Sequence, residues 1–192
     1  MKKTEPLKLL NKEIKEILIL LHGIYNKTPK NFNTLCFKAL RAIKNGKKII
    51  FFGNGGSASD AQHLAAELVC KYKKKRNAIS AISLSTDTSV ITSIGNDIDF
   101  KFIFSRQIEA IGSPGDIVIA ITTSGNSNNL VEAIKAANKK KLITFCLSGN
   151  NGGKLKKYVK FPILIPSSVT SQTQVLEILI GQIFCEFLEN NN

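Results

Sequence analysis

The segment FFGNGGSASDAQHLAAELVC, residues 51–70, joins an apolar run to a helical pattern through a loop rich in glycine and serine. The run KKIIFFG, which leads into this loop, is short and rich in residues that favour β-structure, so it predicts a buried strand. Residues 58–72 then carry the apolar spacing of an amphipathic helix. A strand that passes through a tight loop into a helix is the repeating unit of a parallel α/β sheet.

The same alternation of short apolar runs and helical patterns continues through the rest of the chain. Strands are expected at 78–84, 116–122, 142–148 and 160–166. Helices are expected at 8–27, 32–45, 88–95, 100–111, 127–140 and 170–189, with the first one broken by Pro29. The sequence therefore predicts an α/β fold, in which helices cover both faces of a parallel sheet.

Length and composition limit the class of protein. A chain of 192 residues, 43% of them hydrophobic, is long enough for one well-formed core. It contains no run of 18 apolar residues, and its N-terminus carries acidic residues without a small-residue cleavage site, so we expect neither a membrane span nor a signal peptide. The four cysteines form no C-x-x-C pair and lie in apolar contexts, which favours reduced, buried thiols and a cytoplasmic location.

The net charge of +13 raises the possibility of an anionic macromolecular partner. Only three of the 27 cationic residues, Arg41, Arg76 and Arg106, are arginine, whereas proteins that read nucleic acids rely on arginine. The lysines occur in short clusters at the expected ends of helices, where positive charge is favourable. A lysine-rich surface is the preferred interpretation, and nucleic-acid binding is not expected.

Two loops follow expected strands and resemble each other in composition. The first loop is GNGGS, residues 53–57, and the second loop is TTSGNS, residues 122–127. Glycines let the backbone approach a ligand, and the free N–H groups at the start of a helix favour an anion. Neither loop is a Walker A motif. The pair predicts a phosphate site, and the alternative is two ordinary strand-to-helix turns.

The helix after the first loop carries His63 and Glu67 four positions apart, so both lie on one face, with Asp60 nearby. The imidazole could hold a metal ion, and the carboxylate could be a ligand or a general base. The alternative is a surface His–Glu pair. The position of the pair beside an expected phosphate loop favours a small phosphorylated substrate.

Five motifs together resemble the phosphoheptose isomerases, a branch of the sugar isomerase (SIS) domain family. They are GNGGSASDAQHLAAEL, SIGNDIDF, FSRQIEAIG, GDIVIAITTSGNSNNL and LSGNNGGKL. The resemblance implies one Rossmann-like SIS domain over 1–192, with N-terminal helices in 1–46 and the parallel α/β core in 47–190. It also implies a homotetramer with active sites between subunits. The implied reaction converts sedoheptulose 7-phosphate to D-glycero-D-manno-heptose 7-phosphate for lipopolysaccharide synthesis.

Site residues carry over from the motifs position by position. Glu67 would be the base that moves a proton between C1 and C2 through an enediol, and His63 and Glu67 would bind zinc. Gln174 matches a family glutamine that would contact both zinc and substrate. The remaining substrate-binding residues would be Asn54, Gly55, Gly56, Ser57, Asn96, Asp97, Thr122, Thr123, Ser124 and Ser127.

The last helix departs from the family pattern Arg-Ile-Gln-Glu-x-His, because residues 172–177 read QTQVLE. Gln182 occupies the place of a second histidine, which would be both a catalytic residue and a zinc ligand. Glutamine cannot exchange protons near neutral pH and is a poor zinc ligand. One alternative is therefore a weakly catalytic or non-catalytic regulator, similar to the DnaA-initiator-associating protein, with a DnaA-like protein partner. Another is an isomerase for a different phosphosugar.

Overall fold

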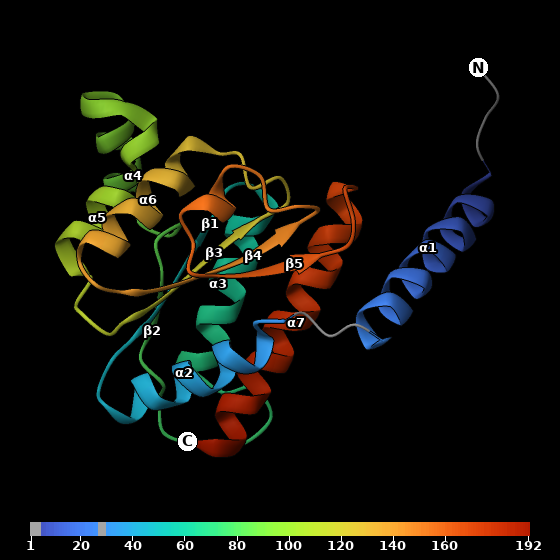
Figure 1. Ribbon diagram of the computed structural model, residues 1–192, viewed down its shortest axis with the longest axis horizontal. Helices are drawn as coiled ribbons and strands as arrows, with labels where there is room; N and C mark the ends of the chain where they lie inside the picture. Colours follow the sequence, from blue (N-terminus) through green and yellow to red (C-terminus); the bar gives the residue numbers. More distant parts are fainter. Residues whose placement is uncertain (1–4, 27–29) are drawn as a thin grey trace.

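The computed structural model describes residues 5–26 and 30–192, and its centre is a sheet of five parallel strands (Figure 1). The strands lie in the order β2-β1-β3-β4-β5, and each neighbouring pair is parallel. Their bounds are β1 Ile49–Gly53, β2 Ala81–Ser83, β3 Ile117–Thr122, β4 Ile143–Gly149 and β5 Phe161–Ile165. The expected fold class is confirmed.

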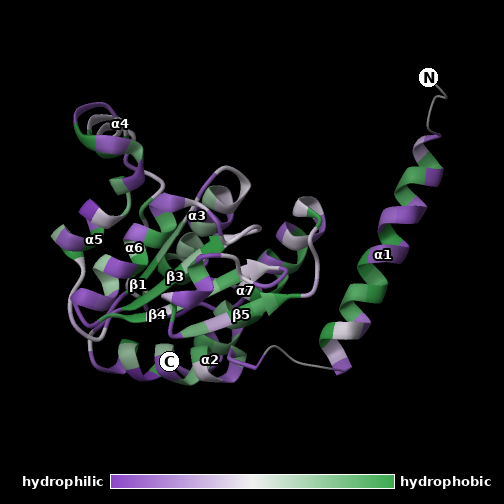
Figure 2. Ribbon diagram, turned by 45° about the horizontal axis from the view of Figure 1, so that its top comes forward, coloured by the Kyte–Doolittle hydropathy of each residue, from purple (hydrophilic) through white to green (hydrophobic). Residues whose placement is uncertain are grey.

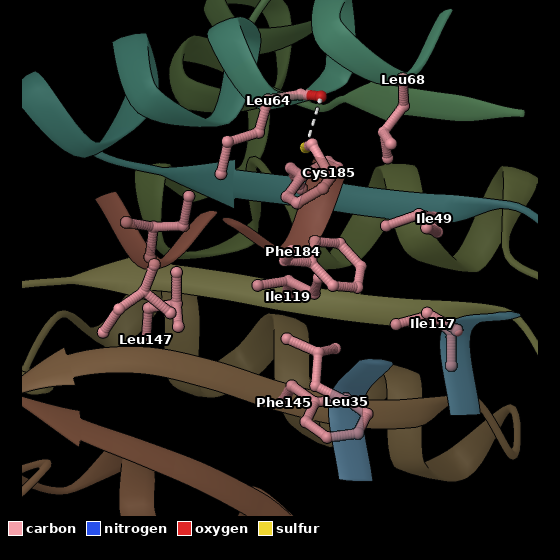
Figure 3. Close-up of a cluster of buried hydrophobic side chains, with 14 of the residues drawn as sticks. Leu35, Ile49, Leu64, Leu68, Ile117, Ile119, Phe145, Leu147, Phe184 and Cys185 are labelled. Carbon is pink, nitrogen blue, oxygen red and sulfur yellow. Dashed lines mark hydrogen bonds between the residues drawn. The ribbon is translucent and has the colours of Figure 1, made fainter. Parts of the chain in front are cut away.

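The helices α2 (Phe32–Lys44), α3 (Gly56–Val69) and α7 (Thr170–Asn191) cover one face of the sheet, and α5 (Ser105–Ile111) and α6 (Asn128–Lys139) cover the other. Side chains of a strand alternate between the two faces. Ile49 and Phe51 therefore belong to the core below α3 and α7, shown in Figure 3, while Ile50 and Phe52 belong to the opposite core. A sheet covered on both faces explains why its central strands are apolar throughout.

Two expected elements differ from the structure. The helix expected at 100–111 is interrupted: a 3-10 turn, Phe100–Phe102, precedes α5. The Asp99 carboxylate accepts a hydrogen bond from the backbone N–H of Lys101 at 2.8 Å and so starts a separate turn. Strand β2 is shorter than the expected 78–84, because the N–H of Ile79 donates to the Leu68 carbonyl at 3.0 Å instead of to the sheet.

Three further elements complete the chain. Helix α4 (Thr88–Ile94) runs into a π-helix, Gly95–Asp99, and a 3-10 turn, Leu155–Lys157, precedes β5.

Of the four free thiols, Cys70 is exposed, so the expectation of buried cysteines is wrong at that position. The expected end of the first helix at Lys27 and its break at Pro29 lie outside the described residues.

Helix α1 (Pro6–Asn26) extends away from the body of the subunit (Figure 1). None of its residues is buried, although Figure 2 shows hydrophobic segments recurring along it. Leu7, Leu18 and Ile19 are 72%, 58% and 71% exposed. It contacts the start of α7 through the Gln172 side chain, which donates to the Glu16 carboxylate at 2.6 Å. None of the helices in residues 5–26 and 30–192 is long and apolar enough to cross a membrane.

Helices α3 and α7 lie side by side and run in the same direction, along a line of contact that we call the α3–α7 seam. At its start, Gly56 lies against the Gln174 side chain. Farther along, Leu64 packs on Gly181, where an added Cβ would lie 2.5 Å from Leu64 Cδ1. The Cys185 thiol then approaches the Leu64 carbonyl at 3.8 Å (Figure 3). Glycine at 181 is therefore what lets the two helices approach closely.

Candidate functional site

The first loop leaves the carboxyl end of β1 and leads into the start of α3. Gly55 has a φ of +55°, which favours glycine, and an added Cβ at Gly56 would collide with the Gln174 amide. No side chain caps the start of α3. Ala58 and Ser59 donate their N–H groups to the Gly55 carbonyl, so the N–H groups of Gly56 and Ser57 are the ones available to an anion, and the helix dipole favours negative charge there.

The second loop leaves β3, the strand beside β1, so the two loops are neighbours at the carboxyl edge of the sheet. Thr122 Oγ1 accepts a hydrogen bond from the Gly125 N–H at 3.2 Å. Gly125 has a φ of +66° and packs so closely on the Gly152 carbonyl that a Cβ could not fit. Helix α6 follows this loop, and its start also has no side-chain cap. The second loop therefore offers the same kind of anion site as the first.

A reciprocal pair of side-chain amides joins the two loops. Asn54 Nδ2 donates to Asn129 Oδ1 at 3.0 Å, and Asn129 Nδ2 donates to Asn54 Oδ1 at 2.8 Å. Sequence reasoning named Asn54 but missed Asn129, which is only 3% exposed. The only signal was an amide in the first turn after the second loop, and its partner could not be known without the sheet order.

A cavity of about 240 Å³ lies between the two loops. Eight of the expected substrate-binding residues line it: Asn54, Gly56, Ser57, Thr122, Thr123, Ser124, Ser127 and Gln174. Ile121 and Thr170, which were not expected, complete the lining. None of the lining side chains carries a charge. A phosphate group here would be held by hydroxyls, amides and the N–H groups at the starts of two helices.

His63 and Glu67 lie farther along α3, outside the lining of this cavity. His63 Nε2 and Glu67 Oε1 are 3.0 Å apart, and the two side chains are 47% and 20% exposed. A carboxylate at hydrogen-bond distance from an imidazole can hold the ring in one orientation and exchange a proton with a bound ligand. The pair is therefore accessible and chemically suited to acid–base work.

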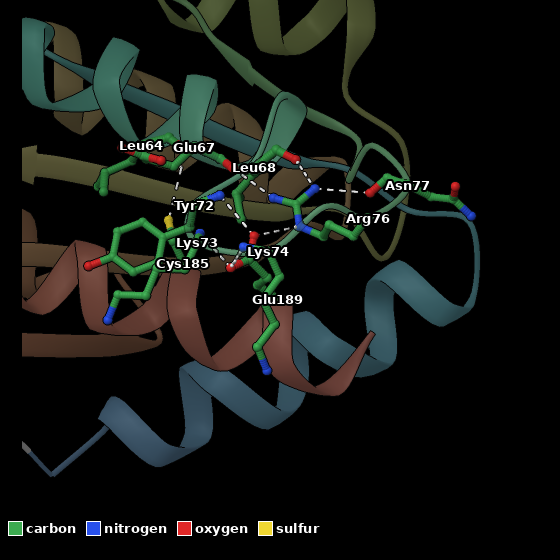
Figure 4. A network of polar contacts seen from close by, with 10 residues as sticks. All are labelled: Leu64, Glu67, Leu68, Tyr72, Lys73, Lys74, Arg76, Asn77, Cys185 and Glu189. Carbon is green, nitrogen blue, oxygen red and sulfur yellow. Dashed lines mark hydrogen bonds and ion pairs between the residues drawn. The ribbon is translucent and has the colours of Figure 1, made fainter.

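Arg76 fixes the end of α3 that carries Glu67 (Figure 4). Its guanidinium donates to the backbone carbonyls of Glu67 and Leu68, each at 2.7 Å. Arg76 Nε in turn lies 3.3 Å from the carboxylate of Glu189 near the end of α7. Both side chains are almost fully buried, at 9% and 1% exposed. The C-terminal part of α7 thus helps to position the backbone of Glu67.

Glu189 is held by more than this ion pair. Its carboxylate accepts hydrogen bonds from the backbone N–H groups of Tyr72, Lys73 and Lys74 at 2.8, 2.6 and 2.9 Å. Burial alone would raise the pKa of Glu189, but these three amides and the Arg76 guanidinium outweigh it and lower the pKa below its usual range. Glu189 therefore stays ionised and fastens the lysine-rich segment after α3 to α7.

Asn96 and Asp97 lie apart from the loop cavity within one chain. They belong to the π-helix after α4, where Asn96 Nδ2 donates to Asp97 Oδ1 at 2.7 Å. Both residues are exposed. Asp97 and Arg106 line a different cavity, of about 520 Å³, between α4 and α5. The structure of a single chain does not bring these two residues to the loops.

The side chains expected to bind zinc are a poor donor set. His63, Glu67, Gln174 and Gln182 supply one imidazole, one carboxylate and two neutral amides, and the imidazole already contacts the carboxylate. Across the described parts of the chain, no three His, Cys, Asp or Glu side chains lie close enough together to hold a metal ion. Protein zinc sites are built from thiolates, imidazoles and carboxylates. The residues present do not fit a zinc centre.

The sequence and the fold were compared with known proteins. Residues 14–149 match the SIS domain family. A phosphoheptose isomerase of Aquifex aeolicus (strain VF5) is 47% identical over 148 residues, 77% of this chain and 78% of the relative. Another, from a Nitratiruptor species, is 41% identical over 182 residues, 95% of this chain and 97% of the relative.

A solved structure shows the same fold over nearly the whole chain. Phosphoheptose isomerase from Neisseria gonorrhoeae superposes with a TM-score of 0.91 at 32% sequence identity, and the match covers 97% of this chain and all of that one. The family match spans well over half of the sequence, and the relatives agree along most of its length. This chain therefore belongs to the SIS domain family, within its phosphoheptose isomerase branch.

Proposed function

We propose that this protein interconverts sedoheptulose 7-phosphate and D-glycero-D-manno-heptose 7-phosphate, and so supplies heptose for lipopolysaccharide synthesis. The observation that carries the proposal is the uncharged cavity between two helix starts, beside an accessible His–Glu pair on one of those helices. The relatives named above are phosphoheptose isomerases, which supports the same reaction. Their names also favour an enzyme over the regulatory alternative.

The substrate phosphate would lie between the first and second loops. Its oxygens would accept hydrogen bonds from the N–H groups at the starts of α3 and α6 and from hydroxyls such as those of Ser57 and Ser124. The Gln174 amide closes this cavity from α7, where it touches the Gly56 backbone. Binding the phosphate end in this way would leave the sugar chain free to extend along α3 toward Glu67.

Glu67 would act as the base. Its carboxylate would take a proton from C1 of the ketose while the C2 carbonyl oxygen gains a proton, giving an enediol. Return of the carbon-bound proton to C2, while the O1 hydroxyl loses its proton, would give the aldose, so no electron acceptor is required. His63, 3.0 Å from Glu67, would orient the carboxylate. Gln182 can donate hydrogen bonds to substrate hydroxyls but cannot transfer a proton.

We derive no step through zinc, because the donor set described above does not fit it. General acid–base catalysis by one positioned group contributes a factor of about 10²–10⁴ in rate. A chain that retains Glu67 but carries glutamine at 182 should therefore be a slow isomerase rather than an inactive one.

We also propose that the working form is a homotetramer. Helix α1 exposes Leu7, Leu18 and Ile19, and α7 exposes Val175, Leu179 and Ile183 at intervals of one turn. Apolar stripes of this size on adjacent helices are costly to leave in water. A second copy that covers them could also bring its Asn96 and Asp97 toward the loop cavity, which a single chain does not do.

The deciding experiment is turnover of sedoheptulose 7-phosphate by the native chain and by the variant Glu67→Gln. The native chain should turn the substrate over and Glu67→Gln should be silent, because an amide cannot take the proton from C1. Glu109→Gln is the matched control, since that side chain is 53% exposed on α5, and it should keep native turnover. Turnover that survives Glu67→Gln would contradict the mechanism, and no turnover by the native chain would favour the regulatory alternative.

A further inference from the structure

Helix spacing places Asp60 and Glu177 at the same level of the α3–α7 seam. The seam contacts begin with Gly56 against Gln174 and continue with Leu64 against Gly181. One turn beyond Gly56 is Asp60, and one turn beyond Gln174 is Glu177, so these two acids occupy the position between the two contacts. Helical residues three or four apart lie on the same face. The two acids thus lie at the same level of the seam, between two close contacts, and the charge of Asp60 acts on Glu177.

Both acids have buried carboxyl oxygens without adequate partners. Glu177 is 0% exposed, and neither of its carboxyl oxygens accepts a hydrogen bond of good geometry from the described residues. Asp60 Oδ2 is buried and unpartnered as well. An ionised carboxylate in such surroundings is strongly disfavoured. Two neighbouring carboxylates cannot both be ionised there at low cost.

The groups around the pair form no ion pair with either acid in the part of the chain that the structure describes. On α3, His63 is the one cationic candidate, and its charge would act on Asp60. On β4, burial raises the pKa of Cys146 to about 12, so this residue stays a neutral thiol. Strand β5 has no titratable residue, and the cations of α2 are Lys38, Arg41 and Lys44, none of which forms an ion pair with either acid.

We propose that Asp60 and Glu177 share one proton across the seam, and that the resulting acid–carboxylate pair positions the two helices that build the site. Glu177 carries the proton and donates it as a hydrogen bond to Asp60. The hydrogen bond links α3 and α7 midway between the loop cavity and the His63–Glu67 pair. The positioning role rests on the proposed isomerase function, whereas the shared proton does not.

The direction of titration agrees with this assignment. Burial, and next the charge of Asp60, raise the pKa of Glu177 from its ordinary 4.5 to about 8, while the Thr122 backbone amide opposes the rise. Burial also raises the pKa of Asp60, and His63 counteracts it. The folded chain therefore binds this proton more tightly than the unfolded chain does. Consequently, the contribution of Glu177 to stability is fully present below about pH 4.5 and is lost progressively as the pH rises through about 8.

Infrared spectroscopy of the native chain tests the shared proton directly. At pH 7 the spectrum should contain the carbonyl band of a protonated carboxylic acid, and the band should titrate away near pH 8. It should be absent from Glu177→Gln, whose amide mimics the protonated acid, and present in Glu186→Gln, a control on the exposed side of α7. No such band in the native chain would overturn the proposal, even if Glu177→Gln failed to fold.

Urea denaturation provides the second readout. The native midpoint should fall between pH 6 and pH 9, whereas the Glu177→Gln midpoint should stay level over that range. If the midpoints of the native chain and of Glu177→Gln changed equally with pH, the result would contradict the shared proton. Stabilisation of the native chain by Mg²⁺ or Na⁺, lost in Glu177→Gln, would mean that a cation rather than a proton joins the two acids, and would also overturn the proposal.

The positioning role is read from the pH profile of turnover. Native kcat should decline above about pH 8, Glu177→Gln should not show this decline, and both should have the same KM at pH 7. Identical declines would reject the positioning role and leave the shared proton standing on the infrared result. If the native chain had no turnover at all, the proposed function would fail, while the infrared and urea results would still decide the proton.

Discussion

At the scale of single residues, the site differs from its family pattern mainly on α7. Gln174, which matches the family glutamine, lines the cavity. Its side-chain amide packs against Gly56 so closely that a Cβ at residue 56 would collide with it. Gln182 lies next to Gly181, and Gly181 packs on Leu64 one position after His63. Residue 182 therefore lies at the level of the turn of α3 that carries the acid–base pair. An exchange at this position should change the chemistry without changing the fold.

We predict that Gln182→His raises kcat for sedoheptulose 7-phosphate, by up to about 10²-fold, because imidazole adds a group that exchanges protons near neutral pH. Steady-state kinetics measure the effect. Gln62→His, which adds an imidazole on the exposed side of the same helix pair, should change nothing. An unchanged kcat in a folded Gln182→His variant would mean that residue 182 does not reach the reacting carbons.

At the scale of elements, the sequence predicted what depends on local pattern. Short apolar runs and helical spacing gave the order of strands and helices, and the rule that parallel strands present ligands at their carboxyl ends brought the two loops together. The sequence could not predict the roles of Asn129 and Glu189. The hydrogen-bond partner of Asn129 lies 75 residues away along the chain, and those of Glu189 lie more than 110 residues away. Sequence reasoning also missed the break at Asp99, where one side chain competes with the helix for a backbone N–H.

We predict that Arg76→Met lowers the free energy of unfolding by about 2–3 kcal/mol, because it leaves the buried Glu189 without its counter-ion. It should also lower kcat more than it raises KM, since the carbonyl of Glu67 loses its donor. Arg76→Lys should restore stability in part. Urea denaturation and steady-state kinetics measure both effects.

Arg41→Met is the control. Arg41 is exposed on α2, so its replacement should lower the free energy of unfolding by less than about 0.5 kcal/mol. A fall in stability with kcat unchanged would show that Arg76 fastens α7 without positioning Glu67.

At the scale of the whole molecule, α1 is the feature that a single chain explains least. It is 21 residues long, exposes leucine and isoleucine along its length and buries none of its residues. Amphipathic helices ordinarily cover their apolar side against a core. Here only other copies of the chain are available in the proposed tetramer to cover that side.

We predict that the double variant Ile14→Glu and Leu18→Glu reduces the assembly from a tetramer to smaller species at micromolar concentration. Two carboxylates on the apolar side of α1 would have to be buried in the interface, at a cost of several kcal/mol. Sedimentation velocity measures the mass. Lys15→Glu changes an exposed position between them and should leave the assembly intact. A native chain that sediments as a monomer would contradict the proposed tetramer.

The order of elements along the chain also sets the order in which the cavity can be completed during synthesis. Both loops and the helices that follow them precede α7, which supplies Thr170, Gln174 and the Glu189 anchor. A nascent chain that has reached β5 therefore contains the two helix starts, yet it lacks the amide that closes the cavity and the carboxylate that fixes the end of α3. The residues that would hold an anion are thus synthesised before those that complete the geometry required for turnover.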